Sequence, residues 1–338
     1  MDSTINRKLP VGAEPQPGGG VHFRVWAPAR RRVELVFEPP ELPETALEPE
    51  AGPDGYHSAF VRAAAPGIRY RYRLDGAGPY PDPASRFQPK GPLGSSEVID
   101  PDAFAWSDSH WRGPTPEGQV FYEMHVGTFT QEGTWEAAIE MLPALADLGI
   151  TTIELMPAAE FPGRFGWGYD GVDFFAPTRL YGRPDDMRRF IDEAHRLNLA
   201  VILDVVYNHF GPDANVLPEF GPHYASGRHS SEWGETPNYD AEHSGSVRAF
   251  VLANVRYWIE DFHLDGLRVD ATQGVHDDSP DHILAAITRT ARACTGRRLL
   301  MVAESEPQDG RILTPIEQGA SASTWPGPTT STTRPLSP

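Results

Sequence analysis

The chain has 338 residues, and 39% of them are hydrophobic, so it is long enough to bury one large core or two ordinary ones. Its formal net charge of -18 argues against nucleic acid and anionic membranes as partners, because both are bound through clustered Lys and Arg. Cys294 is the only cysteine, the first residues show no apolar signal segment, and no apolar run approaches the ~18 residues of a membrane span. We therefore expect a cytoplasmic protein that acts on a neutral or cationic ligand.

The N-terminal part alternates apolar and polar residues, as antiparallel strands with one buried face do. The clearest segments are VHFRVW (21–26), RVELVFE (32–38) and IRYRYRL (68–74). They predict a small antiparallel β-sandwich over residues 18–95, preceded by a loose, Pro-rich arm over residues 1–17. The acidic residues 38–55 are expected to form a turn, and the Pro-rich residues 79–101 irregular extended chain. We place the linker between domains at residues 96–115.

From residue 116 the pattern changes to alternating strands and helices, which predicts a parallel sheet with its site at the carboxyl ends of the strands. The predicted strands are residues 119–125, 151–157, 200–209, 266–270 and 299–304, and the helices are residues 134–147, 184–198, 247–262 and 281–294. Five strands do not close an eight-strand barrel. The predicted fold class is therefore α/β, with a β-sandwich followed by an incomplete (β/α)8 barrel over residues 116–319.

The strand AVILDVVYNH (200–209) organises the predicted sheet. Asp204 interrupts its apolar run, and a buried carboxylate is normally paired, coordinated or functional because burying it unpaired is costly. Side chains alternate along a strand, so Asp204 shares a face with Asn208, and His209 follows where the strand ends.

Two further strands end in charged residues. Arg268 and Asp270 are two residues apart, so both point to one side and the guanidinium can hold the carboxylate ionised and oriented. Glu304 ends the following strand. Two carboxylates, one kept anionic and one free to hold a proton, suit glycoside hydrolysis with a nucleophile and a general acid. A purely structural ion pair at the strand ends is the alternative.

Three motifs in register resemble conserved regions one to three of the α-amylase family of (β/α)8 glycosidases. They are DVVYNH (204–209), GLRVD (266–270) and VAE (302–304). The resemblance implies that Asp270 is the nucleophile of a retaining mechanism and Glu304 its general acid and base, with carboxyl groups about 5 to 5.5 Å apart. It also implies that Arg268 orients Asp270, and that the subsite for the attacked glucose is shaped by Asp204, Asn208 and His209.

A fourth segment, WGYDGVDFFAP (167–177), resembles the family loop whose tyrosine stacks on that glucose, here Tyr169. A core aromatic is the alternative, and the neighbouring glycines favour the loop. Where relatives often carry His three residues after the nucleophile, this chain has Gln273, which changes that substrate contact.

Within the family, three features are similar to the malto-oligosyltrehalose trehalohydrolase subgroup: the sandwich, PDPASRFQP (81–89) and YEMHVGTFTQEGTW (122–135). This resemblance implies hydrolysis of the α-1,4 bond next to the trehalose end of malto-oligosyl trehalose, or action on a related α-glucan, as a step of trehalose biosynthesis. Glycogen branching enzymes and isoamylase-type debranching enzymes share the sandwich and the three motifs, so both remain alternatives.

The family's fourth region, a His-Asp pair on the seventh strand that supplies a third carboxylate, has no counterpart in this sequence. The resemblance ends near Gly319, where the composition changes to Ala, Ser, Thr, Pro and Gly, so we expect a truncation or frameshift there and a non-homologous tail over residues 320–338. The non-enzymatic alternative is an inactive glucan-binding fragment with apolar strand edges left open. In that case Trp26 is the sandwich residue to test for sugar stacking, against simple packing in the core.

We expect neither a metal nor a cofactor. His209, His223, His229 and His243 lie in predicted loops without the spacing of metal ligands. No Gly-rich phosphate loop precedes a helix.

Overall fold

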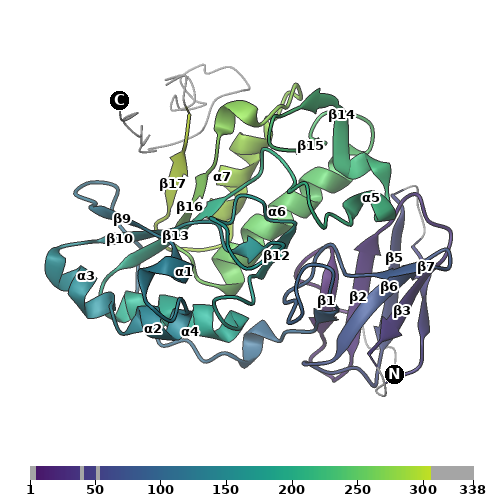
Figure 1. Cartoon of the computed structure of the whole chain (residues 1–338), viewed down its shortest axis with the longest axis horizontal. Helices are drawn as coiled ribbons and strands as arrows, with labels where there is room; N and C mark the ends of the chain where they lie inside the picture. The colour runs from purple at the N-terminus through teal and green to yellow at the C-terminus, as the bar shows by residue number, and fades with distance from the viewer. Residues whose placement is uncertain (1–4, 39–41, 51–53, 306–338) are drawn as a thin grey trace.

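The computed structural model describes residues 5–38, 42–50 and 54–305. Figure 1 shows a β-sandwich beside a larger unit in which helices surround a parallel sheet. The two units are joined by residues 98–120, which contain the short η1 helix Pro101–Ala103. Within the described residues, no helix is both long enough and apolar enough to cross a membrane.

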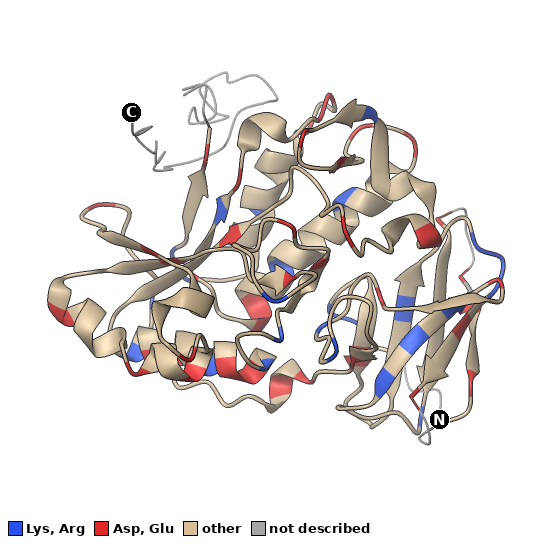
Figure 2. Cartoon of the chain, in the orientation of Figure 1, with Lys and Arg blue, Asp and Glu red and all other residues tan. Residues whose placement is uncertain are grey.

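The sandwich is built from eight antiparallel strands in the order β1-β2-β5-β4-β3-β6-β7, with β8 also paired to β6. They are β1 (Gly12–Pro15), β2 (Val21–Trp26), β3 (Val33–Phe37), β4 (Thr45–Pro49), β5 (Tyr56–Val61), β6 (Arg69–Leu74), β7 (Ala77–Tyr80) and β8 (Ser96–Glu97). Alternate residues fill the core: the Phe23 ring meets the rings of Phe37 and Tyr70 edge-on, at 6.0 and 4.9 Å between centroids. The intervening arginines of β6 are visible as blue bands in Figure 2, and Arg69 pairs with Glu38.

The expected loose arm is wrong for residues 12–15, which form β1 and pair with β2. The apolar side chains of Leu9, Val11 and Ala13 are buried there, which outweighs the polar, Pro-rich composition around them.

Two other expectations for the sandwich also need correction. The acidic turn contains β4, whose Leu47 is buried, and the unpredicted β5 follows it. The Pro-rich stretch contains β7 and β8 and is largely buried, with Asp82 accepting hydrogen bonds from the Tyr70 hydroxyl and the Ala84 N–H. The sandwich therefore extends to Glu97, inside the range expected for the linker.

Five parallel strands form the sheet of the larger unit, in the order β17-β16-β13-β10-β9, as the sequence predicts. They are β9 (Phe121–Met124), β10 (Thr152–Leu155), β13 (Ala200–Val205), β16 (Gly266–Val269) and β17 (Leu300–Ala303). The helices are α1 (Val126–Phe129), α2 (Trp135–Ile139), α3 (Leu142–Leu148), α4 (Pro184–Arg196), α5 (Leu217–Phe220), α6 (Ser244–Asp261) and α7 (Ile283–Ala293), with the short η2 (Pro222–Tyr224) and η3 (Thr272–Gly274). This is a partial (β/α)8 barrel.

Small strand pairs decorate the barrel: β11 (Ala159–Glu160) with β12 (Asp173–Pro177), and β14 (Ala225–Ser230) with β15 (Glu235–Pro237). The helix expected over residues 134–147 is two helices, α2 and α3, since Pro143 lies in the first turn of a new helix that follows Met141. The side chains of β17 are all buried, so the apolar exposure expected at an open strand edge is absent from this strand.

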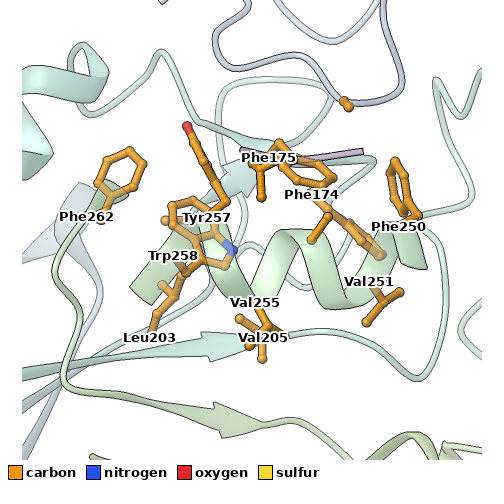
Figure 3. Close-up of a cluster of buried hydrophobic side chains, with 14 of the residues drawn as sticks. Phe174, Phe175, Leu203, Val205, Phe250, Val251, Val255, Tyr257, Trp258 and Phe262 are labelled. Carbon is orange, nitrogen blue, oxygen red and sulfur yellow. The ribbon is translucent and has the colours of Figure 1, made fainter. Parts of the chain in front are cut away.

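Helix α6 anchors the sheet through the apolar stripe that its sequence predicts. Figure 3 shows Val255 and Trp258 lying above Leu203 and Val205 of β13. Phe250 packs against the β12 ring of Phe175 at 5.1 Å between centroids. This packing fixes β13, and hence the position of its carboxyl end, relative to the neighbouring strands.

Trp26 lies where the sandwich meets the barrel. Its side chain is 1% exposed, its indole N–H donates to the Asp54 carbonyl, and its ring meets that of Tyr224 edge-on at 4.7 Å. A role in stacking on sugar is therefore excluded for Trp26, because the ring is enclosed by protein.

A group of aromatic and charged side chains, here called the basal cluster, lies at the amino ends of the strands. It consists of Asp108, Trp111, His195, His263 and Asp265. The two nitrogens of His195 lie 2.9 Å from Asp108 and 2.9 Å from Asp265, and its ring stacks on Trp111. The Trp111 indole donates to Asp265 at 2.7 Å, and His263 contacts Asp108 at 2.8 Å. The segment predicted as a linker is thus fastened to the barrel.

Candidate active site

The carboxyl ends of three adjacent strands bring four charged side chains together. Asp204 of β13 lies in register with Arg268 of β16, and the ladder continues past β16 because the Asp270 N–H donates to the Val205 carbonyl at 3.1 Å. The Glu304 N–H in turn donates to the Val269 carbonyl at 3.0 Å. Backbone pairing therefore sets the positions of these side chains.

Arg268 lies at the centre of the group and donates to three carboxylates. Nη1 is 2.6 Å from Asp204 Oδ2 and 2.8 Å from Asp270 Oδ1, while Nη2 is 2.7 Å from Glu304 Oε2. The Arg268 side chain is 5% exposed, so these charges interact in a poorly screened environment. Asp270 and Glu304 thus face one another across a single guanidinium.

Asn208 and His209 follow β13 rather than belonging to it, because the strand ends at Val205. The face-sharing expected along residues 200–209 therefore holds only to Val205. The chain nevertheless turns both side chains toward the site: Asn208 Nδ2 donates to Asp270 Oδ2 at 2.8 Å, and His209 Nε2 lies 3.1 Å from the Tyr169 carbonyl. A hydrogen bond between His209 Nδ1 and Asn208 Oδ1 joins the two.

Tyr169 reaches the same group from the loop before β12. Its hydroxyl donates to Asp204 Oδ2 at 2.9 Å, and the ring is only partly buried. Gly168 makes this approach possible because its φ is +95°, and a Cβ there would lie 2.1 Å from the Pro157 carbonyl oxygen. Tyr169 is therefore a loop residue that borders the site and not a core aromatic.

A cavity of about 790 Å³ opens over these residues. It is lined by His125, Thr128, Met156, Trp167, Tyr169, His209, Trp233, Arg268, Asp270, Ala271, Gln273 and Glu304. A second hollow of about 720 Å³ shares His125, Thr128, Trp167 and Tyr169 with it, so the two form one groove. A groove of this size accepts several linked sugar units.

Burial governs ionisation in the site. It raises the pKa of Asp204 to about 8, against the opposing effect of Arg268. Burial also raises the pKa of Asp270, and the charge of Glu304 adds to the shift, while Arg268 and the hydrogen bond from Asn208 oppose it. This direction is opposite to the expectation that Arg268 holds Asp270 ionised, because burial and the neighbouring Glu304 outweigh the guanidinium.

The comparisons with known proteins agree with this geometry. Residues 98–233 match the model of the α-amylase catalytic domain, and residues 10–102 match carbohydrate-binding module 48, the isoamylase N-terminal domain. Residues 98–233 are therefore similar to the catalytic domain of the α-amylase family. The predicted resemblance to that family is confirmed, together with the sandwich and the partial barrel.

The malto-oligosyltrehalose trehalohydrolase of Saccharolobus solfataricus is 45% identical over 299 residues, which are 88% of this chain and 52% of the relative. That of Deinococcus radiodurans is 46% identical over 292 residues, 86% of this chain and 47% of the relative. A solved structure of a putative α-amylase from Salmonella typhimurium has a TM-score of 0.83 at 40% identity, covering 88% of this chain and 50% of that one. The chain spans about half the length of the curated relatives it matches.

The structure brings every predicted site residue to one place, Gln273 included. Gln273 lines the groove, and its Oε1 is buried without a hydrogen-bond partner among the described residues. The break in composition expected near Gly319 and the expected non-homologous tail over residues 320–338 lie outside the described residues.

Sequence reasoning did not single out several residues that line the groove. Trp167 and Trp233 are large and exposed, at 71% and 46%, and His125 is held by the Gly166 carbonyl and the Tyr181 hydroxyl. Trp167 lies two residues before Tyr169, and this proximity in the sequence could have identified it as a residue of the groove. Trp233 lies in the turn between β14 and β15, where nothing in the local sequence pattern marks it.

Among the described residues, the remaining histidines contribute to one cluster of metal-ligand-type side chains. One grouping, of His229, Asp240 and Asp278, places its ligand atoms within 4.8 Å of one another. Arg228 already lies 3.3 Å from Asp240 and 3.8 Å from Asp278. A guanidinium therefore supplies the positive charge that these two carboxylates need.

Proposed function

We propose that this chain carries the catalytic site of a glycoside hydrolase that cleaves the α-1,4 bond next to the trehalose end of malto-oligosyl trehalose and releases trehalose. The observation that carries the proposal is the pair Asp270 and Glu304, held on adjacent strand ends by one Arg268 in an open groove. The names of the Saccharolobus and Deinococcus relatives support the choice of substrate. As a location we propose the cytoplasm, which fits a chain whose single cysteine excludes an intrachain disulfide.

The mechanism that suits this pair is retaining. Asp270 attacks the anomeric carbon while the bond from that carbon to the glycosidic oxygen breaks, and Glu304 gives its proton to the departing oxygen. Glu304 then takes a proton from water, whose oxygen displaces Asp270 and restores both side chains. This mechanism requires the two carboxyl groups to lie about 5 to 5.5 Å apart, and their shared contact with Arg268 supports such an approach.

The surrounding residues position the nucleophile. Asn208 holds one oxygen of Asp270 and Arg268 the other, so the carboxylate has a fixed orientation. With a pKa of about 8, Asp204 is mostly protonated at pH 7, which leaves the charge of Arg268 to Asp270 and Glu304. We assign the surface on which the attacked glucose stacks to Tyr169, and a contact to that sugar to Gln273 and His209.

Product analysis tests the proposal. The purified chain is incubated with malto-oligosyl trehalose, and the products are separated by chromatography. Free trehalose, with a matching shorter malto-oligosaccharide, is the expected result. Asp270→Asn serves as the matched control, because it keeps the side-chain volume and the contact with Arg268 but removes the nucleophile.

A second candidate activity is glucan branching. The branching enzyme GlgB of Corynebacterium jeikeium is 33% identical over 276 residues, 75% of this chain and 38% of the relative. In that reaction a glucan hydroxyl replaces water in the second step. New α-1,6 linkages formed from amylose, without free trehalose, would favour it and contradict the proposed hydrolysis.

The non-enzymatic alternative is a fragment that binds glucan without cleaving it. Saturable binding of malto-oligosyl trehalose, with no products after prolonged incubation, would support it. That result would leave the groove a binding site and remove the catalytic roles proposed for Asp270 and Glu304.

A further inference from the structure

The loop between β11 and β12 carries aromatic side chains at three alternate positions, Phe165, Trp167 and Tyr169. We call residues 163–170 the aromatic loop. Phe165 and Trp167 are the most exposed aromatic residues in the described part of the chain, at 87% and 71%. Single exposed apolar side chains are common on protein surfaces, but neighbouring ones that line a groove mark a binding surface. Packing in the core therefore does not explain these two residues.

The three aromatic residues follow one another along the groove. Phe165 lines only the second hollow, of about 720 Å³, while Trp167 and Tyr169 line both this hollow and the cavity over the strand ends. The catalytic pair, Asp270 and Glu304, lines only that cavity. A glucan chain whose attacked glucose lies on Tyr169 therefore passes Trp167 and then Phe165 as it extends away from the catalytic pair.

The second hollow lies on the glucan side of the attacked bond. In the proposed reaction Glu304 gives its proton to the departing oxygen, so trehalose leaves on the Glu304 side of the attacked glucose. Glu304 does not line the second hollow, which leaves that hollow to the remaining glucose units. This assignment rests on the proposed function, because it uses the role that Glu304 has there.

The second hollow offers both kinds of contact that a glucose unit makes. The face of the sugar ring carries C–H groups, which pack on an aromatic ring, and its edge carries hydroxyl groups. Four polar side chains line the hollow: Gln131, Glu132, Arg164 and Asp170. Their amide, carboxylate and guanidinium groups can donate to and accept from hydroxyl groups. Arg164 also lies over the Phe165 ring at 5.6 Å, yet the exposure of Phe165 leaves a face of its ring open.

Hydrogen bonds tie the aromatic loop to the barrel. Between the two exposed aromatic residues, the Gly166 carbonyl oxygen lies 2.9 Å from His125 Nε2, and the Tyr181 hydroxyl lies 3.0 Å from the same nitrogen. At the start of the loop, Arg179 Nη2 donates to the Gly163 carbonyl at 3.2 Å. A surface that is already ordered loses less conformational entropy on binding, so these contacts favour glucan binding.

We propose that the aromatic loop binds the glucose units that follow the attacked one, on the side away from trehalose. Trp167 stacks on the nearer of these units, and Phe165 stacks on a more distant one. The two side chains thereby give the site its preference for longer α-1,4-glucan chains.

Calorimetric titration of the whole chain with maltohexaose tests this proposal. All variants carry Asp270→Asn, which prevents turnover. Trp167→Ala should weaken maltohexaose binding at least about fivefold, the loss of roughly one stacking contact, whereas Trp167→Phe keeps a ring and should lose less. Phe165→Ala should weaken the binding of maltohexaose more than that of maltotriose, because a short chain on Tyr169 and Trp167 does not need Phe165.

The matched control is Leu148→Ala, which removes an apolar side chain of α3 that is 72% exposed and lines neither hollow. It should leave the maltohexaose affinity unchanged. If Trp167→Ala binds maltohexaose as tightly as this control, the proposal is wrong, even where the active chain releases trehalose. Weakened binding in Trp167→Ala, together with no trehalose release by the wild-type chain, would support the stacking role and contradict the proposed hydrolysis.

Chemical oxidation locates the bound glucan independently of any substitution at the loop. N-bromosuccinimide oxidises accessible indole rings, and peptide mass spectrometry reports each tryptophan separately. Maltohexaose should protect Trp167 from oxidation, while Trp106, which is half-buried against His263 and lines neither hollow, should react at an unchanged rate. Unchanged oxidation of Trp167 at a saturating concentration of maltohexaose would overturn the proposal.

Discussion

The two ends of the same parallel strands use similar residues for different purposes. At the carboxyl ends one buried cation, Arg268, is shared by four carboxylates and faces a groove. At the amino ends the carboxylates of the basal cluster are matched by His195, His263 and the nearby Arg297 and covered by Trp111.

Ionisation differs accordingly. At the carboxyl ends burial and mutual repulsion raise the pKa values of Asp204 and Asp270. In the basal cluster burial opposes the charged form of Asp108, but hydrogen bonds from His195 and His263 overcome it and hold the pKa of Asp108 well below its usual range. Carboxylates that outnumber their cation and border a groove have perturbed pKa values and can take part in a reaction. Carboxylates that are matched by cations and covered by aromatic side chains contribute to stability instead.

The largest expected effect comes from a substitution at the carboxyl ends of the strands. Asp270→Asn should reduce trehalose release by at least about 10³-fold, because covalent catalysis needs the carboxylate. Urea unfolding should change little, since an amide still contacts Arg268 and the repulsion from Glu304 is removed. A loss of more than about 3 kcal/mol in unfolding free energy would show that Asp270 has a structural role instead.

The next largest effect comes from a substitution in the basal cluster. His195→Ala removes the shared partner of Asp108 and Asp265, both buried, and should lower the unfolding free energy by about 3 kcal/mol. Arg189→Ala, which breaks an exposed ion pair on the same helix, is the control and should cost less than about 1 kcal/mol. Glucan binding in the groove should be unchanged. If the two variants unfold alike in urea, the basal cluster does not stabilise the barrel.

The pH dependence of stability sharpens the comparison, since both ends hold protons more tightly in the folded state. The pKa of Asp204 rises to about 8, so its contribution to stability falls as the pH rises from about 4 to about 8. The pKa of His195 is also raised through Asp108 and Asp265, despite burial, so its contribution is complete below about pH 6.5 and is lost above it. Each proton gives a slope of up to about 1.4 kcal/mol per pH unit.

Unfolding curves measured from pH 5 to 9 separate these two contributions. Asp204→Asn should flatten the dependence throughout this range. His195→Ala should flatten it only above about pH 6.5. A stability that rises with pH in the wild-type chain would contradict both assignments.

The smallest expected effect concerns the border between groove and core. Tyr169→Phe removes the hydroxyl bond to Asp204 but keeps the aromatic ring, so substrate affinity should fall about fivefold, or about 1 kcal/mol. Tyr169→Ala should cost clearly more, because it also removes the stacking surface. Equal effects in a binding titration would mean that the ring does not contact sugar.

The sequence predicted the parallel strands and the carboxyl-end residues well, and the reason is physical. A strand buried on both faces needs a continuous apolar run, so β13 and β17 stand out, and Asp204 is conspicuous within such a run. Strands β4 and β5 lack this signal because neither carries a continuous buried apolar run: the fully buried residue is Leu47 in the described part of β4 and the polar His57 in β5. The two short helices α2 and α3 share one helical period, so periodicity alone did not separate them.

Interactions between distant residues were beyond sequence reasoning. His195 and Asp108 are 87 residues apart, and only the folded chain shows that one holds the other. The ionisation of Asp270 was misjudged for the same reason, since its pKa depends on Glu304 and on burial as well as on its neighbour Arg268. Trp167 and Trp233 line the groove only because the folded chain brings their two segments to it, which the sequence does not show.

The basal cluster also affects how the two units unfold. Trp111 and Asp108 belong to the chain that leaves the sandwich, yet they are fixed to the underside of the barrel. While His195 holds these two residues, the connecting segment cannot detach from the barrel, and the sandwich stays next to it. We expect the sandwich and the barrel to unfold in a single cooperative calorimetric transition. In a variant without the His195 side chain, we expect two transitions.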